Sequence, residues 1–168
     1  MKSILLAGFM ILFYSCNKSK IVPLPSPNLK GNLYADISVA GENTRLESIG
    51  TQTIFNRTVN SPGDTTVVAY GENSDCHIQI VLENIHVPGT YIFGQKLDST
   101  QHISVVYVAG DILSGNAFVY SANNQNDQGI LVIESISYKQ VKGTFTTMCA
   151  GISDTAKITN GGFEGDFQ

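Results

Sequence analysis

The chain has 168 residues, which suffices for one domain behind a leader, and it combines 42% hydrophobic with only 14% charged residues. Its ten basic and 14 acidic residues give a net charge of −4. Four of the basic residues precede Gly31, whereas every acid lies at Asp36 or beyond, so six cations face 14 acids in the rest of the chain. Nucleic-acid binding needs a basic surface, so we expect no nucleic-acid partner.

The first residues have the form of a secretory signal. Lys2 gives a positive start, an apolar run of about ten residues ends at Phe13, and the small residue Ser15 precedes Cys16. The run is too short to span a bilayer as a helix. This arrangement resembles the bacterial lipobox, although Phe13 stands where that motif prefers leucine. The resemblance implies a lipoprotein signal peptide at 1–15 and lipid, such as palmitate, on Cys16. An ordinary secretory signal with an unrelated cysteine is the alternative.

Residues 16–30 are expected to form a lipidated, disordered tether. Pro23, Pro25 and Pro27 favour extended backbone, at roughly 3 Å per residue or about 40 Å in all. An edge strand is the alternative, but proline removes the donors that pairing needs. Asn17 is not the aspartate associated with inner-membrane retention, and no acidic run of the kind linked to surface export follows. We therefore expect an anchor in the outer membrane of a bacterial cell envelope, facing the periplasm.

Residues 31–168 are expected to form a single β-domain, because hydrophobic residues alternate with polar ones from Leu33 onward. No stretch of ten residues shows the helical period. Short strands separated by turn residues predict an all-β fold, an antiparallel β-sandwich, with a small β-barrel as the alternative. The predicted strands are 33–39, 44–49, 52–58, 65–70, 76–85, a strand ending at 93, 102–108, 116–120, 130–137, 141–149, 157–159 and 163–167.

Three glycine motifs have structural interpretations. Pro88-Gly89 suits the centre of a type II turn. Gly143 suits a β-bulge or a backbone with positive φ. Asn160-Gly161 is typical of a tight turn between two strands.

These motifs also occur in a recognisable order. An alternating first strand ending in Gly41 is followed by Pro88-Gly89-Thr90-Tyr91, by Gly143-Thr144-Phe145, and by a final Ile158-Thr159-Asn160-Gly161-Gly162-Phe163. The order resembles a group of small Bacteroidota lipoproteins of unknown function. The resemblance implies a β-rich envelope domain, and it assigns no activity and no functional residues.

If Cys16 carries lipid, two cysteines remain. Export would place Cys76 and Cys149 in an oxidising compartment, and both lie at ends of predicted strands. A disulfide could therefore join them, closing a loop of about 73 residues and contributing about 4 kcal/mol. Two buried thiols are the alternative, because cysteine packs as a small hydrophobic residue.

Catalytic and metal-binding patterns are weak throughout. His77, His86 and His102 lack the spacing of a metal pair, and Ser153-Asp154 lacks the glycines of a nucleophile elbow. Three acids near one hairpin could meet over Ca²⁺, but a solvated loop is favoured: Asp64, Glu72 and Asp75. Five tyrosines are the best candidates for an aromatic platform, although core packing is favoured for most: Tyr70, Tyr91, Tyr107, Tyr120 and Tyr138. We expect no catalytic residues, no metal and no cofactor.

The sequence therefore predicts a protein that is not an enzyme. We expect a lipid-anchored binding or structural module with a protein or glycan partner. A carrier of a hydrophobic ligand, with an apolar lumen inside a barrel, is the alternative.

Overall fold

The computed structural model describes residues 31–95, 97–110, 117–123 and 128–168. The predicted signal peptide at 1–15, the tether at 16–30 and Cys16 lie outside the described residues. No helix in the described ranges is long and apolar enough to cross a membrane.

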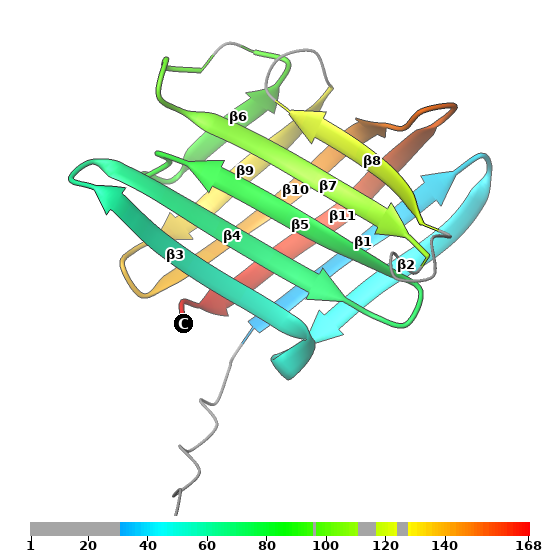
Figure 1. The fold of residues 1–168 in the computed structure, drawn as a ribbon, viewed down its shortest axis with the longest axis horizontal. Helices are drawn as coiled ribbons and strands as arrows, with labels where there is room; N and C mark the ends of the chain where they lie inside the picture. The colour runs from blue at the N-terminus through cyan, green and yellow to red at the C-terminus, as the bar shows by residue number, and fades with distance from the viewer. Residues whose placement is uncertain (1–30, 96, 111–116, 124–127) are drawn as a thin grey trace, which may run out of the picture.

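Eleven strands and one short 3-10 turn make up the described part of the chain (Figure 1). The elements are β1 (Gly31–Val39), β2 (Glu42–Ile49), η1 (Gly50–Gln52), β3 (Thr53–Ser61), β4 (Asp64–Glu72), β5 (Cys76–Glu83), β6 (Gly89–Phe93), β7 (His102–Ala109), β8 (Phe118–Asn123), β9 (Gly129–Ile136), β10 (Gln140–Ala150) and β11 (Thr155–Asp166).

All strand pairs are antiparallel and belong to one sheet, with the order β2-β1-β11-β10-β8-β7-β5-β4-β3. The first part of β10 pairs with β9, which pairs in turn with β6, and the far end of β10 reaches β8 at Ala150 and Ser121. The sheet curls over at this junction, so that β3, β4, β5, β7 and β8 cross in front of the other strands (Figure 1). The predicted all-β antiparallel fold is confirmed, as a two-layered sheet that is nearly closed and barrel-shaped.

The space between the layers is filled by the alternate, inward-facing side chains of the strands. On β5, for example, Ile78, Ile80 and Leu82 are at most 1% exposed, while their neighbours are half-buried. Burying each such side chain contributes about 1.5–3 kcal/mol. One continuous cluster of buried side chains joins both layers. The described interior therefore holds one continuous apolar cluster between the two layers.

A small polar network closes the corner where β2 turns into β3. The buried hydroxyl of Ser48 lies 2.8 Å from the hydroxyl of Thr53 and 2.7 Å from the carbonyl oxygen of Gln52. The Ser48 hydroxyl oxygen also accepts a hydrogen bond from the backbone N–H of Glu72 on β4. These bonds tie the edge strand β2 to the facing layer, because each buried polar group would be costly without its partner.

The predicted turn at Asn160-Gly161 is wrong, because β11 runs through both residues without a break. Asn160 has a φ of +49°, and the pairing of β11 shifts by one residue at this point on both of its sides. Asn160 thus sits at a β-bulge. A bulge and a tight turn demand the same positive φ, which is why the sequence pattern suggested a turn.

The other two glycine motifs differ in outcome. Gly143 lies at a register shift between β9 and β10, but the unpaired residue is Glu134 of β9, so the bulge is in the strand opposite Gly143. Any side chain there would meet the ring of Phe163 and the carbonyl oxygen of Val132. The type II turn at Pro88-Gly89 is wrong, since Gly89 already begins β6 and lacks the positive φ that such a turn requires.

Candidate functional site

The structure holds Cys76 and Cys149 as buried thiols, so the predicted disulfide does not form in it. Cys76 pairs with Ala109 on β7, whereas the Sγ of Cys149 lies 3.9 Å from the carbonyl oxygen of Val105 on the same strand. Val105 and Ala109 are four residues apart, or roughly 13 Å along a strand. The two cysteines thus lie beside different parts of β7. A disulfide needs Cα atoms within about 7 Å, so this separation is too large for one.

The acids that could have met over Ca²⁺ are also separated. Asp64 begins β4 and Glu72 ends it, so the length of the strand lies between them. Glu72 instead accepts a hydrogen bond of 2.6 Å from the hydroxyl of Tyr70. Across the described ranges, no group of three or more histidine, cysteine or acidic side chains could hold a metal ion.

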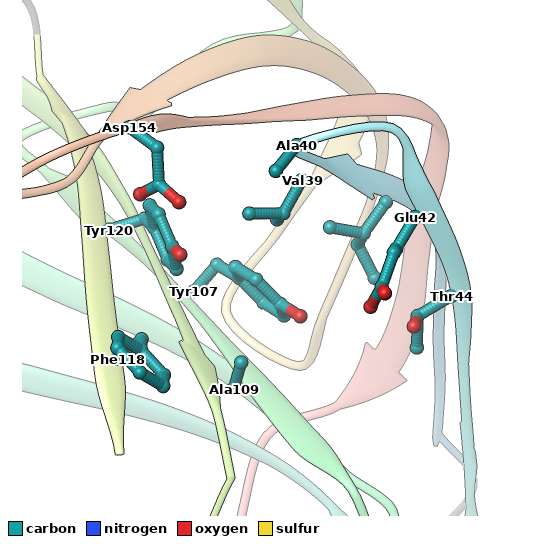
Figure 2. Close-up of a pocket in the computed structure, with 10 residues that line it drawn as sticks. Val39, Ala40, Glu42, Thr44, Tyr107, Ala109, Phe118, Tyr120 and Asp154 are labelled. Atoms are coloured by element: carbon teal, nitrogen blue, oxygen red, sulfur yellow. The ribbon is translucent and has the colours of Figure 1, made fainter. Parts of the chain in front are cut away.

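A pocket of about 330 Å³ opens between the β1–β2 hairpin and strands β7 and β8 (Figure 2). We call it the hairpin pocket. Residues from four separate parts of the chain line it: Ile37, Val39, Ala40, Glu42, Thr44, Tyr107, Ala109, Phe118, Tyr120 and Asp154. Its size lies at the lower end of the range for small-molecule sites.

The hairpin wall of the pocket is set by a two-residue turn. Ala40 and Gly41 both have positive φ, of +50° and +89°, while Val39 and Glu42 face each other as the last pair of the ladder. Two positive φ values are typical of the type I′ turn, whose twist matches that of the flanking strands. The turn carries the apolar Val39 and the carboxylate of Glu42 to the rim of the pocket (Figure 2).

Two stacked tyrosines form the opposite side of the pocket. The ring centroids of Tyr107 and Tyr120 are 5.6 Å apart, with 26° between the ring planes, and each residue is 3% exposed. The ring of Tyr120 also covers Gly151, where any side chain would clash with it. Phe118, on the same face of β8 as Tyr120, is 67% exposed and extends this aromatic wall to the solvent.

Burial keeps both tyrosine hydroxyls neutral. It raises the pKa of Tyr107 to about 12, with a smaller contribution from the nearby thiol of Cys76. Burial also raises the pKa of Tyr120, and the hydrogen bond between its hydroxyl and the Asp154 carboxylate adds to the shift. The tyrosines therefore act as hydrogen-bonding groups at neutral pH and not as bases.

The charge of the pocket comes from the exposed carboxylates of Glu42 and Asp154. No lysine, arginine or histidine is among its lining residues in the described part of the chain. The pocket thus combines apolar and aromatic walls with negative charge at its mouth. Such a site can bury an apolar group and attract a positive charge beside it.

The sequence identified part of this site. Tyr107 and Tyr120 were candidates for an aromatic platform and do meet, whereas Tyr138 is 71% exposed elsewhere. Phe118, Glu42 and Asp154 were not predicted. The apolar residues at 118 and 120 of a short strand were a signal for Phe118, but nothing in the sequence indicated that the two acids would approach the same pocket.

A comparison of the chain with protein families, with curated protein sequences and with solved structures finds no match.

Proposed function

We propose that the protein is a lipid-anchored, non-catalytic binding module of the bacterial cell envelope. Lipid on Cys16 would hold it at the outer membrane, with the domain facing the periplasm. The support comes from the sequence: the signal-like residues 1–15, the proline-rich stretch 16–30, and motifs in the order found in small Bacteroidota lipoproteins. An anchor of two or three acyl chains holds firmly, because each buried methylene contributes about 0.8 kcal/mol.

We propose further that the hairpin pocket is the recognition site of this module. The observation that carries the proposal is the combination of an exposed aromatic ring, Phe118, with the carboxylates of Glu42 and Asp154 around one apolar hollow. An apolar side chain next to a lysine or arginine would satisfy both features. A protein partner fits this chemistry better than a neutral glycan, whose hydroxyl groups need many polar contacts.

Matched dipeptide amides test the pocket directly. Acetyl-Phe-Lys-amide should shift the NMR signals of Phe118 and Tyr120, because it offers an aromatic ring and a positive charge together. Acetyl-Phe-Glu-amide and acetyl-Ser-Lys-amide should bind at least several-fold more weakly, since each lacks one feature. Asp154→Asn should remove the preference for lysine over glutamate. Equal binding of the lysine and glutamate peptides would contradict the proposal.

The carrier of a hydrophobic ligand remains the second candidate, favoured by the same apolar walls. The ligand would fit the hairpin pocket, whose volume of about 330 Å³ suits a small molecule. The carrier predicts that a neutral probe such as n-octanol binds at Phe118 and that Asp154→Asn leaves its affinity unchanged. A binding module selective for charge predicts little binding of this probe.

A further inference from the structure

Arg57 of β3 has no charged partner in the part of the chain that the structure describes. Its side chain makes no hydrogen bond and no ion pair there. It is nevertheless half-buried, because it follows Thr53 and Phe55 on the face of β3 that points between the layers. A guanidinium that loses water without gaining a partner is costly, so its position requires an explanation.

Two other cations of the domain show the usual arrangement. Arg45 lies 2.6 Å from the carboxylate of Asp36, and Lys142 lies between Glu134 and Glu164 at 3.4 and 3.5 Å. Acids outnumber cations more than two to one in residues 31–168, so a partner for Arg57 would be easy to supply. The lack of one leaves five N–H donors in a planar fork, which matches a carboxylate or a phosphate.

Arg57 lines a second pocket, which we call the arginine cleft. It has a volume of about 200 Å³, and its lining residues are Arg57, Ile85, His86, Ile136, Ser137 and Tyr138. No acid is among these described lining residues, and two of them can carry positive charge. The space is sufficient for one phosphate group and much too small for a folded segment.

The two sides of the cleft are held together by the last residues of the chain. The N–H of Phe167 donates to the carbonyl oxygen of Lys139, and the N–H of Gln168 donates to that of Phe55. One side is thereby fixed two residues from Arg57 and the other next to Tyr138. The backbone on both sides of the cleft is therefore held in place by hydrogen bonds.

The cleft lies at the end of the barrel where the described chain begins. Gly31 pairs with Gly165, which also pairs with Val141, close to the β9–β10 turn that carries Tyr138. The ring of Phe55 packs directly against Gly31. If residues 16–30 connect the domain to a membrane, this is the end to which they attach.

Exposed apolar side chains lie close in the chain to residues of the same cleft. Val59, two residues beyond Arg57, is 59% exposed, as is Val87 next to His86, and Tyr138 is 71% exposed. The ammonium group of Lys139 lies 5.3 Å from the ring centre of Tyr138. Exposed apolar residues, tyrosine and cations together are typical of surfaces that contact lipid headgroups.

We propose that the arginine cleft binds the phosphate group of a membrane lipid. The guanidinium of Arg57 donates hydrogen bonds to the phosphate oxygens, His86 and Tyr138 border the anion, and Val59 and Val87 contact the glycerol and acyl groups. The lipid as the source of the phosphate rests on the membrane anchor proposed above, whereas the anion site itself rests on Arg57 and its surroundings. Bound in this way, the domain would face the membrane with the end that carries the tether.

The test uses the full chain with Cys16→Ala, so that binding cannot come from the anchor. The probes are dihexanoyl phosphatidylglycerol below its micelle concentration, inorganic phosphate, and dihexanoylglycerol, which lacks the phosphate. The Nε–H signal of Arg57 in NMR spectra reports the contact. The phospholipid should shift this signal, and the other two probes should bind at least about tenfold more weakly. Arg57→Gln should weaken phospholipid binding about tenfold or more, because charge-assisted hydrogen bonds are lost.

Arg45→Gln is the matched control, because it removes the same charge from an exposed site and should leave phospholipid binding unchanged. Equal affinity for inorganic phosphate and phospholipid would overturn the lipid as the source of the anion. An unshifted Arg57 signal, or full binding by Arg57→Gln, would overturn the cleft as an anion site. A failure of lipid attachment at Cys16 would leave all these results unchanged, so the two proposals fail separately.

Discussion

The two ends of the barrel differ in charge and in packing. At one end, the hairpin pocket is bordered by Glu42 and Asp154, and its mouth carries the exposed ring of Phe118. At the other end, the arginine cleft presents Arg57 without a partner among the described residues, and the ring of Phe55 packs against glycines. The nine residues of β1 separate the two ends by roughly 25–30 Å.

This difference shows that a small domain built from one sheet can present chemically different surfaces at its two ends. An overall excess of acid would suggest a domain that avoids anionic lipid at every face. The structure instead places a cation without a partner among the described residues, and exposed apolar residues, at the end where β1 begins, and leaves the acidic pocket at the far end. We infer that the domain binds the membrane with one end and a partner with the other.

The largest expected effect concerns the proposed lipid anchor, on which the orientation of the domain at the membrane depends. Cys16→Ala should abolish incorporation of labelled palmitate and release the protein from the membrane fraction, because we propose that the cysteine thiol is the attachment site. The Cys16→Ala variant should keep Ser15 and the rest of the signal unchanged, so that only the attachment site is lost. Label that persists in the Cys16→Ala variant would contradict the anchor and, with it, the orientation.

The next effect tests the close packing at the end of the barrel where β1 begins. Gly165→Ala should lower the free energy of unfolding by about 1–3 kcal/mol, because the new methyl group would overlap the ring of Phe55 in a filled space. Gly89→Ala is the matched control, since its methyl group would make only ordinary contacts with Tyr91. Urea denaturation measures both, and equal stability of the two variants would show that Phe55 can move aside.

Tyr107, in the wall of the hairpin pocket, should make the stability of the protein depend on pH in the alkaline range. The pKa of Tyr107 is raised to about 12 in the folded protein from an ordinary value of 10. The unfolded chain therefore releases this proton first, and the stability contributed by the neutral hydroxyl is lost as the pH rises from about 10 to 12. Tyr107→Phe should reduce this alkaline loss of stability by about 1 kcal/mol at pH 11, and by less than about 3 kcal/mol over the whole window. Thermal melts at pH 9 and 11 compare the two proteins, and identical pH dependence would contradict the burial of this hydroxyl.

The smallest effect is expected at Arg57 itself. Arg57→Gln should leave the free energy of unfolding unchanged or raise it by up to about 0.5 kcal/mol, because the variant loses no described hydrogen bond or ion pair and no longer desolvates a guanidinium. Chemical denaturation of this variant and of wild type gives the difference. A loss well above 1 kcal/mol would identify Arg57 as a structural residue and would weaken its assignment to a binding site.

The strands could be predicted from the sequence, because their alternation is a local property. Residues 33–39, 65–70 and 76–85, for example, fall in β1, β4 and at β5, and the predicted strands 130–137 and 141–149 correspond to β9 and β10. The bulge at Asn160 was mistaken for a turn because both require a positive φ. Only the pairing of β11 with its two neighbours distinguishes the two cases.

The sites could be predicted far less well, because they depend on how distant segments meet. Phe118 and Asp154 lie 36 residues apart in the chain and reach one pocket only because β8 and β10 meet at Ser121 and Ala150. Arg57 looked like an ordinary strand residue. Its importance lies in the lack of a partner among the described residues, and a sequence does not show which neighbours a side chain will have.

The orientation of the domain on a membrane tests the central claim most directly. Single cysteines for a fluorophore can be introduced by Asn60→Cys, near the arginine cleft, and by Asn43→Cys, near the hairpin pocket, since both native cysteines of the domain are buried. The lipidated protein would be placed in phosphatidylglycerol vesicles that carry a quencher on the headgroups. Our account predicts strong quenching at 60, weak quenching at 43, and loss of the difference with Arg57→Gln. Equal quenching at both positions, or stronger quenching at 43, would contradict it.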